Sequence, residues 1–276
     1  MFLNSTRRTI CFLNKLFWKI VNMTSQNLTL GMSVDESFKQ HEYNDYDPQS
    51  MTQMHGMMIG NKQQWFPMGN DKNYKIVPFM GLNYYVDINT VRPSYDANKN
   101  YVELLKQLAE SFENNITMMD ICAGSGCVGF SVKNNSNKID RLSSVEINPD
   151  PIHSMKKTIE INKLENIDCI QSDCLDNVPQ RKYQLISANP PHFEVKGTVD
   201  GCDYGWSFHK KFLNSITDYM DDDSYLTLIE HGLGLDILNF KLLMPNTLFV
   251  FHIEKFTNSP FYCIILKKKL TIWKKC

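Results

Sequence analysis

The chain has 276 residues, 42% of them apolar, and a formal net charge of −1 at pH 7. This length and apolar content are typical of one sizeable α/β domain with a small appendage, and they exclude a largely disordered chain. The near-neutral charge indicates no large basic face for nucleic acid, and no stretch is long and apolar enough to span a membrane. The eight cysteines include no Cys-x-x-Cys pair, so we expect a reducing, cytoplasmic compartment and neither a disulfide framework nor a structural metal.

The first 34 residues contain no Asp or Glu and combine four basic residues with several large apolar ones. This composition is typical of a mitochondrial targeting segment, and equally of a plain extension before an internal start at Met23 or Met32. We therefore expect residues 1–34 to be a basic extension, either a targeting segment or disordered. Residues 35–100 are predicted to form a small polar segment that ends in a hairpin.

Methionines recur at helical spacing between residues 51 and 58, which indicates a short packed helix. Two short strands, 74–79 and 82–86, are predicted around Gly81 as a hairpin. An amphipathic helix is predicted for residues 101–108.

From Met118 onward, apolar strand-like runs alternate with helical segments. The expected strands are 118–120, 142–145, 167–172, 183–189 and 225–230, then an antiparallel pair at 248–253 and 262–266, and the expected helices are 149–162 and 209–220. This alternation predicts an α/β fold, with a mostly parallel sheet covered on both faces. We interpret Asp221–Asp223 as a solvated turn and His209 as a residue on the solvated face of its helix.

The first candidate motif is Asp120 followed by Gly124-x-Gly126-x-x-Gly129, where a strand gives way to a helix. Alone, this glycine pattern also fits a dinucleotide site, so a nicotinamide-dependent oxidoreductase stays as an alternative. The Asp120 carboxylate would repel a pyrophosphate and would suit a ligand that carries an amino group and a positive sulfonium. Glu146 and Asp173 follow the next two strands, where they can accept ribose hydroxyls and meet an adenine amine.

The second candidate motif is Asn189-Pro190-Pro191-His192, at the end of the strand 183–189. Two prolines cannot continue a central strand because they donate no hydrogen bond to its neighbours. The chain must therefore turn there, with the Asn189 amide held just before the turn. The Asn189 side-chain oxygen and the Pro190 carbonyl can accept both N–H groups of a target –NH2.

The order of these motifs, each near a strand end, resembles the class I S-adenosylmethionine-dependent methyltransferases over roughly residues 77–269. The resemblance implies a Rossmann-like, doubly wound seven-stranded sheet, with residues 101–276 as the catalytic domain and S-adenosyl-L-methionine as the cofactor. It implies cofactor contacts by Asp120, Ala123, Gly124, Gly126, Glu146, Asp173 and Asn189. It implies catalysis by Asn189, Pro190 and His192 without a metal, and substrate contacts by Arg92, Asn189, Pro190, Pro191, His192 and Phe193.

Within this superfamily, Asn-Pro-Pro followed by an aromatic residue marks the branch that methylates amino and amide nitrogens. The Arg-Pro dipeptide at Arg92 resembles the entry segment of HemK-type protein glutamine methyltransferases, although Val91 replaces the first proline of their Pro-Arg-Pro. His192 stands where related enzymes have Tyr or Phe. It either stacks on the target group, accepts a proton, or only fills the aromatic's place, in which case Phe193 can supply the plane.

Two further segments resemble the glutamine methyltransferases more loosely, namely the loop 200–206 and Glu230, which we interpret as a strand end. The leading functional hypothesis is therefore N-methylation of a glutamine side chain in a protein partner of the release-factor type. The alternatives are methylation of an exocyclic amine in RNA or DNA, methylation of a small-molecule amine, and a catalytically silent methyltransferase-like binding subunit. The sequence does not determine the oligomeric state.

Overall fold

The computed structural model describes residues 74–87, 93, 95–193, 202–203, 206–231, 237–256, 259 and 261–269. The chain divides into two units, Met1–Met51 and Thr52–Cys276, and all described residues lie in the second. The predicted extension 1–34, the methionine-rich helix at 51–58 and Arg92 lie outside the described residues. Within the described part, no helix is long and apolar enough to cross a membrane.

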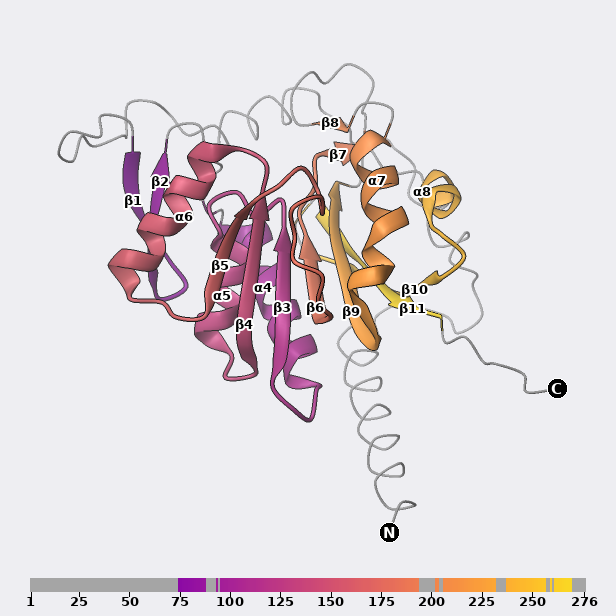
Figure 1. The fold of residues 1–276 in the computed structure, drawn as a ribbon, viewed down its shortest axis with the longest axis horizontal. Coiled ribbons are helices and arrows are strands. Elements are labelled where there is room, and N and C mark those ends of the chain that lie inside the picture. The colour runs from indigo at the N-terminus through magenta and orange to yellow at the C-terminus, as the bar shows by residue number, and fades with distance from the viewer. Residues whose placement is uncertain are drawn as a thin grey trace, which may run out of the picture. The chain divides into compact units, whose positions relative to one another are not determined.

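The described domain is built on a seven-stranded sheet with the strand order β10-β11-β9-β6-β3-β4-β5 (Figure 1). The strands are β3 (Ile116–Ile121), β4 (Ile139–Glu146), β5 (Ile167–Gln171), β6 (Tyr183–Ala188), β9 (Met220–His231), β10 (Leu248–Lys255) and β11 (Phe261–Lys268). β3, β4, β5, β6 and β9 run parallel, and β11 runs antiparallel to both β9 and β10. The strand order reverses beside β3, which has β4 on one side and β6 on the other, and such a switch point is where open α/β sheets bind ligands.

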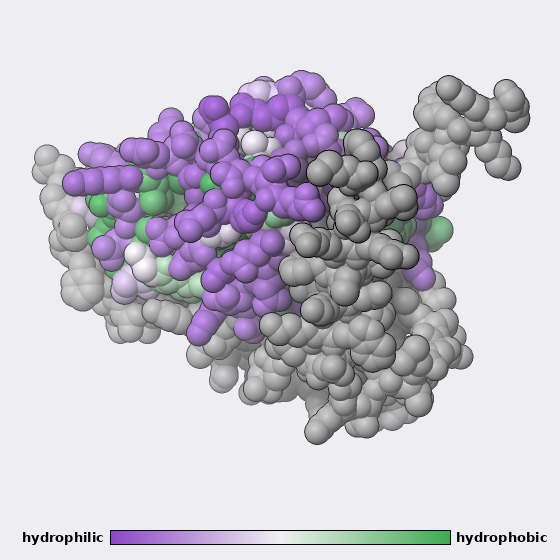
Figure 2. All heavy atoms as spheres, turned by 90° about the horizontal axis from the view of Figure 1, so that it is seen from below, coloured by the Kyte–Doolittle hydropathy of each residue, from purple (hydrophilic) through white to green (hydrophobic). Residues whose placement is uncertain are grey.

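Both faces of the sheet are covered, as predicted for a doubly wound fold. One face packs against α4 (Tyr95–Glu110), α5 (Cys127–Asn135) and α6 (Pro149–Asn162), and the other packs against α7 (Ser207–Ser215), η3 (Ile216–Tyr219) and α8 (Ile237–Leu243). Adjacent strand residues alternate between the two cores, so that Met118 belongs to the first and Met119 to the second. On the face seen in Figure 2, most of the described surface is hydrophilic, and apolar residues show only in smaller areas between polar ones.

The predicted hairpin is present as β1 (Tyr74–Phe79) and β2 (Leu82–Asp87), which pair antiparallel. It packs on the helices of the first face, because the Tyr84 hydroxyl bonds the Ser131 hydroxyl at 2.7 Å and the Tyr85 N–H donates to Thr158 Oγ1 at 2.9 Å. The Tyr84 side chain is fully buried in that core. The hairpin therefore shares the hydrophobic core of the sheet.

The helix predicted for residues 149–162 is present with the same limits. Pro149 suits the first turn, and Lys163 ends the helix in the left-handed conformation, where its N–H donates to the Glu160 carbonyl. The helix predicted for 101–108 is longer and begins at Tyr95.

The predicted helix 209–220 is α7 followed by the 3-10 turn η3. The interpretation of Asp221–Asp223 as a turn is wrong, because these residues form the first part of β9. The strand begins this early because Met220 pairs with Tyr183 on β6, and because Ser224 Oγ accepts the Asp221 N–H and donates to the Tyr183 carbonyl.

Candidate active site

The two candidate motifs lie side by side at the switch point of the sheet. Asn189 follows β6, and its backbone N–H donates to the carbonyl of Ile121 at 3.4 Å. Ile121 is the last residue of β3 and directly precedes the glycine loop. This bond therefore joins the Asn-Pro-Pro turn to the start of the glycine loop, although the two motifs are far apart in the sequence.

The glycine loop has one crowded and one open glycine. Gly124 and Gly126 have φ values of 54° and 76°, in the left-handed region that favours glycine. A Cβ atom at Gly126 would lie 2.8 and 2.9 Å from ring atoms of Phe130, whereas a Cβ at Gly124 would meet nothing within 4 Å. The Ala123 N–H donates to the Val145 carbonyl at 3.0 Å and so ties the loop to β4. The loop therefore has an open side at Gly124 where a ligand can approach the backbone.

Asp120 holds the two motifs together from inside the protein. Its side chain is 2% exposed, Oδ1 accepts the Ser187 hydroxyl at 2.6 Å, and Oδ2 accepts the Gly129 N–H at 3.0 Å. Burial raises the pKa of Asp120 to about 6, and these two hydrogen bonds oppose the rise. Both carboxylate oxygens thus accept hydrogen bonds from the chain itself, and direct contact of Asp120 with a ligand stays a prediction.

Glu146 ends β4 beside the glycine loop and is 7% exposed. Its Oε2 accepts the Gly124 N–H at 3.0 Å, and its Oε1 accepts the N–H groups of Ile147 and Asn148 at 2.9 and 3.0 Å. These bonds fix the direction of the carboxylate, and Oε2 keeps further acceptor capacity next to the open side of the loop. The charge, position and orientation of Glu146 fit a ligand that carries neighbouring hydroxyl groups.

Asp173 lies just past the end of β5 on the surface, with its side chain 62% exposed. Its carboxylate forms an ion pair with Lys211 Nζ at 2.9 Å, and the same ammonium contacts Asp176 at 2.7 Å. Contact of Asp173 with an adenine amine stays a prediction.

The Asn-Pro-Pro turn presents its amide side chain to solvent. Asn189 and Pro191 are exposed and Pro190 is buried. The Tyr101 hydroxyl on α4 anchors the base of the turn, because it bonds Thr227 Oγ1 at 2.7 Å and donates to the Ala188 carbonyl at 3.4 Å.

The backbone after the turn continues as β7 (His192–Phe193), which pairs parallel with β8 (Cys202–Asp203). The side chains of His192 and Phe193 lie outside the described part of the structure, so their roles stay predictions.

The sequence of this chain is similar to one protein family and to several characterised proteins. Residues 102–211 match the family described as "Methyltransferase small domain". The chain is 25% identical over 173 residues to "Ribosomal protein uL3 glutamine methyltransferase" of Francisella tularensis, which covers 56% of this chain and 53% of that protein. It is 25% identical over 209 residues to "Release factor glutamine methyltransferase" of Fusobacterium nucleatum, and this match covers 70% of this chain and 58% of that protein. The chain thus spans a little over half the length of these two relatives.

Solved structures show the same fold. The tRNA m1G37 methyltransferase of M. jannaschii matches with a TM-score of 0.53 and 21% identity, over 73% of this chain and 56% of that one. SMU.776 complexed with SAH matches with a TM-score of 0.53 and 11% identity, over 74% of this chain and 57% of that one.

The family match over residues 102–211, the relatives and the fold together support a class I methyltransferase of the HemK type. The fold and family predicted from the motifs are confirmed, and so is the similarity to glutamine methyltransferases. The alternative of a nicotinamide-dependent oxidoreductase is therefore set aside.

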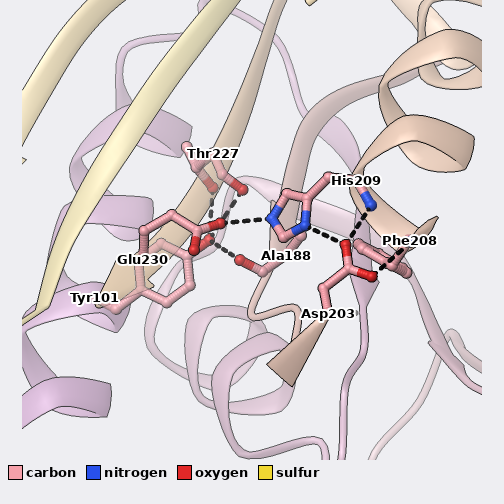
Figure 3. A network of polar contacts seen from close by, with 7 residues as sticks. All are labelled: Tyr101, Ala188, Asp203, Phe208, His209, Thr227 and Glu230. Carbon is pink, nitrogen blue, oxygen red and sulfur yellow. Dashed lines mark hydrogen bonds and ion pairs between the residues drawn. The ribbon is translucent and has the colours of Figure 1, made fainter. Parts of the chain in front are cut away.

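The methyltransferase domain contains a polar network that the sequence interpretation missed (Figure 3). His209 Nδ1 lies 2.6 Å from Asp203 Oδ2, and His209 Nε2 lies 2.8 Å from Glu230 Oε1. The placement of His209 on a solvated face is wrong, because its side chain is 0% exposed. Its spacing offered a signal, since His209 is followed at helical intervals by Phe212, Leu213 and Ile216, which are all buried.

The charges of this network stabilise each other. Burial lowers the pKa of His209, but the bonds to Asp203 and Glu230 raise it more, to about 9. Burial raises the pKa of Asp203, but its hydrogen bonds from His209, Phe208 and Ser207 lower it further, to about 2. At neutral pH, His209 is therefore an imidazolium that donates to carboxylates on both sides.

Proposed function

We propose that this protein is an S-adenosylmethionine-dependent N-methyltransferase that acts on the side-chain amide of a protein glutamine. The observation that carries the proposal is the hydrogen bond from the Asn189 backbone to the Ile121 carbonyl. It brings the exposed Asn189 side chain next to the glycine loop, which is the arrangement that transfer between a cofactor and an amide requires.

The residues around the glycine loop fit the cofactor. The open side of Gly124 leaves room for close approach to the backbone, and Glu146 is oriented beside it to accept ribose hydroxyls. Ala123 and Gly126 shape the loop, and Asp173 is proposed to meet the adenine amine. When bound, S-adenosylmethionine supplies a methyl group on a positively charged sulfur.

The chemical task of the protein is to position and polarise a weak nucleophile. An amide nitrogen reacts poorly because its lone pair is delocalised into the carbonyl. We propose that the Asn189 side-chain oxygen and the Pro190 carbonyl accept hydrogen bonds from the two N–H groups of the target amide. These bonds favour a tetrahedral nitrogen and stabilise the charge that develops on it. Holding the nitrogen in line for attack can contribute up to about 7–11 kcal/mol.

A glutamine in a protein is the substrate that the observations favour. The two relatives described above are named as glutamine methyltransferases that act on a ribosomal protein and on a release factor. The net charge of −1 supports a protein partner rather than a nucleic acid. The absence of a Cys-x-x-Cys pair from the sequence favours a reducing compartment, and we propose a cytoplasmic one.

The test is methyl transfer by wild type and Asn189→Ala from labelled S-adenosylmethionine. The acceptors are purified uL3 from Francisella tularensis, release factor from Fusobacterium nucleatum, and total RNA. Asn189→Ala should lower the rate by about 10²–10³, as for loss of one preorganised hydrogen-bonding group at a reacting centre. Its cofactor affinity, measured by calorimetry, should stay near that of wild type.

Asn114→Ala is the matched control, because Asn114 is an exposed asparagine that precedes β3 at the opposite end of the strand. This variant should transfer methyl at the wild-type rate. Equal labelling by Asn189→Ala and wild type would refute the mechanism, and labelling confined to RNA would refute the protein substrate. Mass spectrometry should locate the methyl group on a glutamine.

A further inference from the structure

We propose that His209 is a positioning residue for methyl transfer. It holds in place the strand pair β7–β8, whose first strand directly follows the Asn-Pro-Pro turn. The inference rests on the proposed function for its catalytic consequence. Its structural part stands on the contacts of Asp203, His209 and Glu230 alone.

The network joins three elements that are separate in the sheet topology. Asp203 ends β8, His209 lies in the first turns of α7, and Glu230 lies near the end of β9 (Figure 3). The side chains of Asp203, His209 and Glu230 are 2% exposed or less. Buried charged groups of this kind are costly unless they are paired, so the three residues must keep their mutual geometry in the folded state.

Asp203 connects the buried His209 to the strand β7, which follows the Asn-Pro-Pro turn. Its backbone pairs in register with Phe193 on β7, four residues after Asn189. Its carboxylate accepts the backbone N–H groups of Phe208 and His209, each at 2.9 Å, and so fixes β8 on the start of α7. The other side of His209 is held by Glu230, whose strand β9 pairs with β6 up to Ala188. The strands before and after the Asn-Pro-Pro turn are therefore both held, through Glu230 and Asp203, by the buried His209 imidazole.

The protonated form of His209 is the one that can hold both carboxylates. Both ring nitrogens donate hydrogen bonds in the imidazolium, whereas the neutral ring has only one N–H. The charged groups that face His209 are Asp203 from β8 and Glu230 from β9. Tyr101 from α4 lies near Glu230 (Figure 3), and the Glu230 charge also acts on Cys263 from β11; burial raises the pKa of both Tyr101 and Cys263. Loss of the proton at alkaline pH should therefore release one side of the network.

The experiment compares His209→Phe, which keeps a planar ring without N–H groups, with His252→Phe as the matched control. His252 also pairs with a carboxylate, Glu254 at 3.0 Å, but it lies on β10 at the edge of the sheet. Hydrogen exchange of backbone amides is measured in peptides that cover 186–193, together with cofactor affinity by calorimetry. Methyl transfer to release factor of Fusobacterium nucleatum is measured as kcat/KM.

We expect His209→Phe to exchange faster at β7 and to bind S-adenosylmethionine within about twofold of wild type. Its kcat/KM for the protein acceptor should fall about 100-fold, the size of effect that a small misplacement at a reacting centre produces. His252→Phe should match wild type in all three measurements. Unchanged exchange at β7, or cofactor affinity lost together with methyl transfer, would overturn the proposal.

Glu230→Gln provides a second variant that preserves shape and can still accept a hydrogen bond from His209. Removal of the Glu230 charge should lower the pKa of His209, so the alkaline fall in kcat/KM, expected near pH 9 in wild type, should move to lower pH. A merely structural role would leave that pH profile in place and would contradict the proposal. If wild type transfers methyl to no acceptor, the proposed function fails, and the exchange measurement still decides whether His209 holds β7–β8.

Discussion

The two glycines of the cofactor loop should respond to alanine in different ways. Gly126→Ala places a Cβ atom at a φ of 76°, 2.8 Å from the Phe130 ring and 3.1 Å from Met155 Cγ. The left-handed conformation costs about 1–2 kcal/mol, and overpacking adds about 1–3 kcal/mol, so the free energy of unfolding should fall by about 2–5 kcal/mol. Gly124→Ala, at a φ of 54° with no atom within 4 Å of the new Cβ, should cost only about 1–2 kcal/mol of conformational strain.

Urea unfolding of the two variants and wild type measures these free energies, and calorimetry measures the affinity for S-adenosylmethionine. The new methyl group of Gly124→Ala enters the space that we propose for the cofactor, so the affinity of this variant for S-adenosylmethionine should fall although it loses less stability than Gly126→Ala. Equal losses of stability in the two variants would refute the packing argument. Unchanged affinity in Gly124→Ala would refute the placement of the cofactor at this loop.

Three further predictions concern buried groups around the site. The pKa of Asp120 is raised from 3.8 to about 6, so the folded state binds its proton more tightly and the free energy of unfolding falls as pH rises through this range. Asp120→Asn should remove about 2–3 kcal/mol of that fall between about pH 4 and about pH 8, measured by urea unfolding at these two pH values; an unchanged pH dependence would contradict it. Tyr101→Phe should lower the free energy of unfolding by about 1–2 kcal/mol through loss of its hydroxyl bonds to Thr227 and Ala188, and a stability equal to wild type would argue against this anchor. Glu146→Ala should weaken cofactor binding by about 1.5–3 kcal/mol in calorimetry, and unchanged affinity would rule out its ribose role.

The elements of the domain could be predicted from the sequence because each depends on neighbours along the chain. The apolar run before Asn189 indicates a strand, two prolines end it, and the pair of residues Asn148 and Pro149 marks a helix start. The alternation of such elements predicts a doubly wound sheet, and the acidic residues and glycines at successive strand ends predict where a ligand binds. For these features the local sequence was sufficient.

Contacts between distant residues were decided only by the tertiary structure. Nothing near Asp120 in the sequence indicates that Ser187 donates to it across neighbouring strands, or that this bond links the two motifs. His209 is polar and sits in a helix, and only the approach of Asp203 and Glu230 from two strands makes its burial favourable. The sequence by itself determined most of the strands and helices and the strand ends that carry the candidate site, but not the early start of β9 or the short strands β7 and β8. The tertiary structure decided which polar groups are buried together, because the free energy of a buried charge depends on partners that only the folded chain brings within hydrogen-bonding distance.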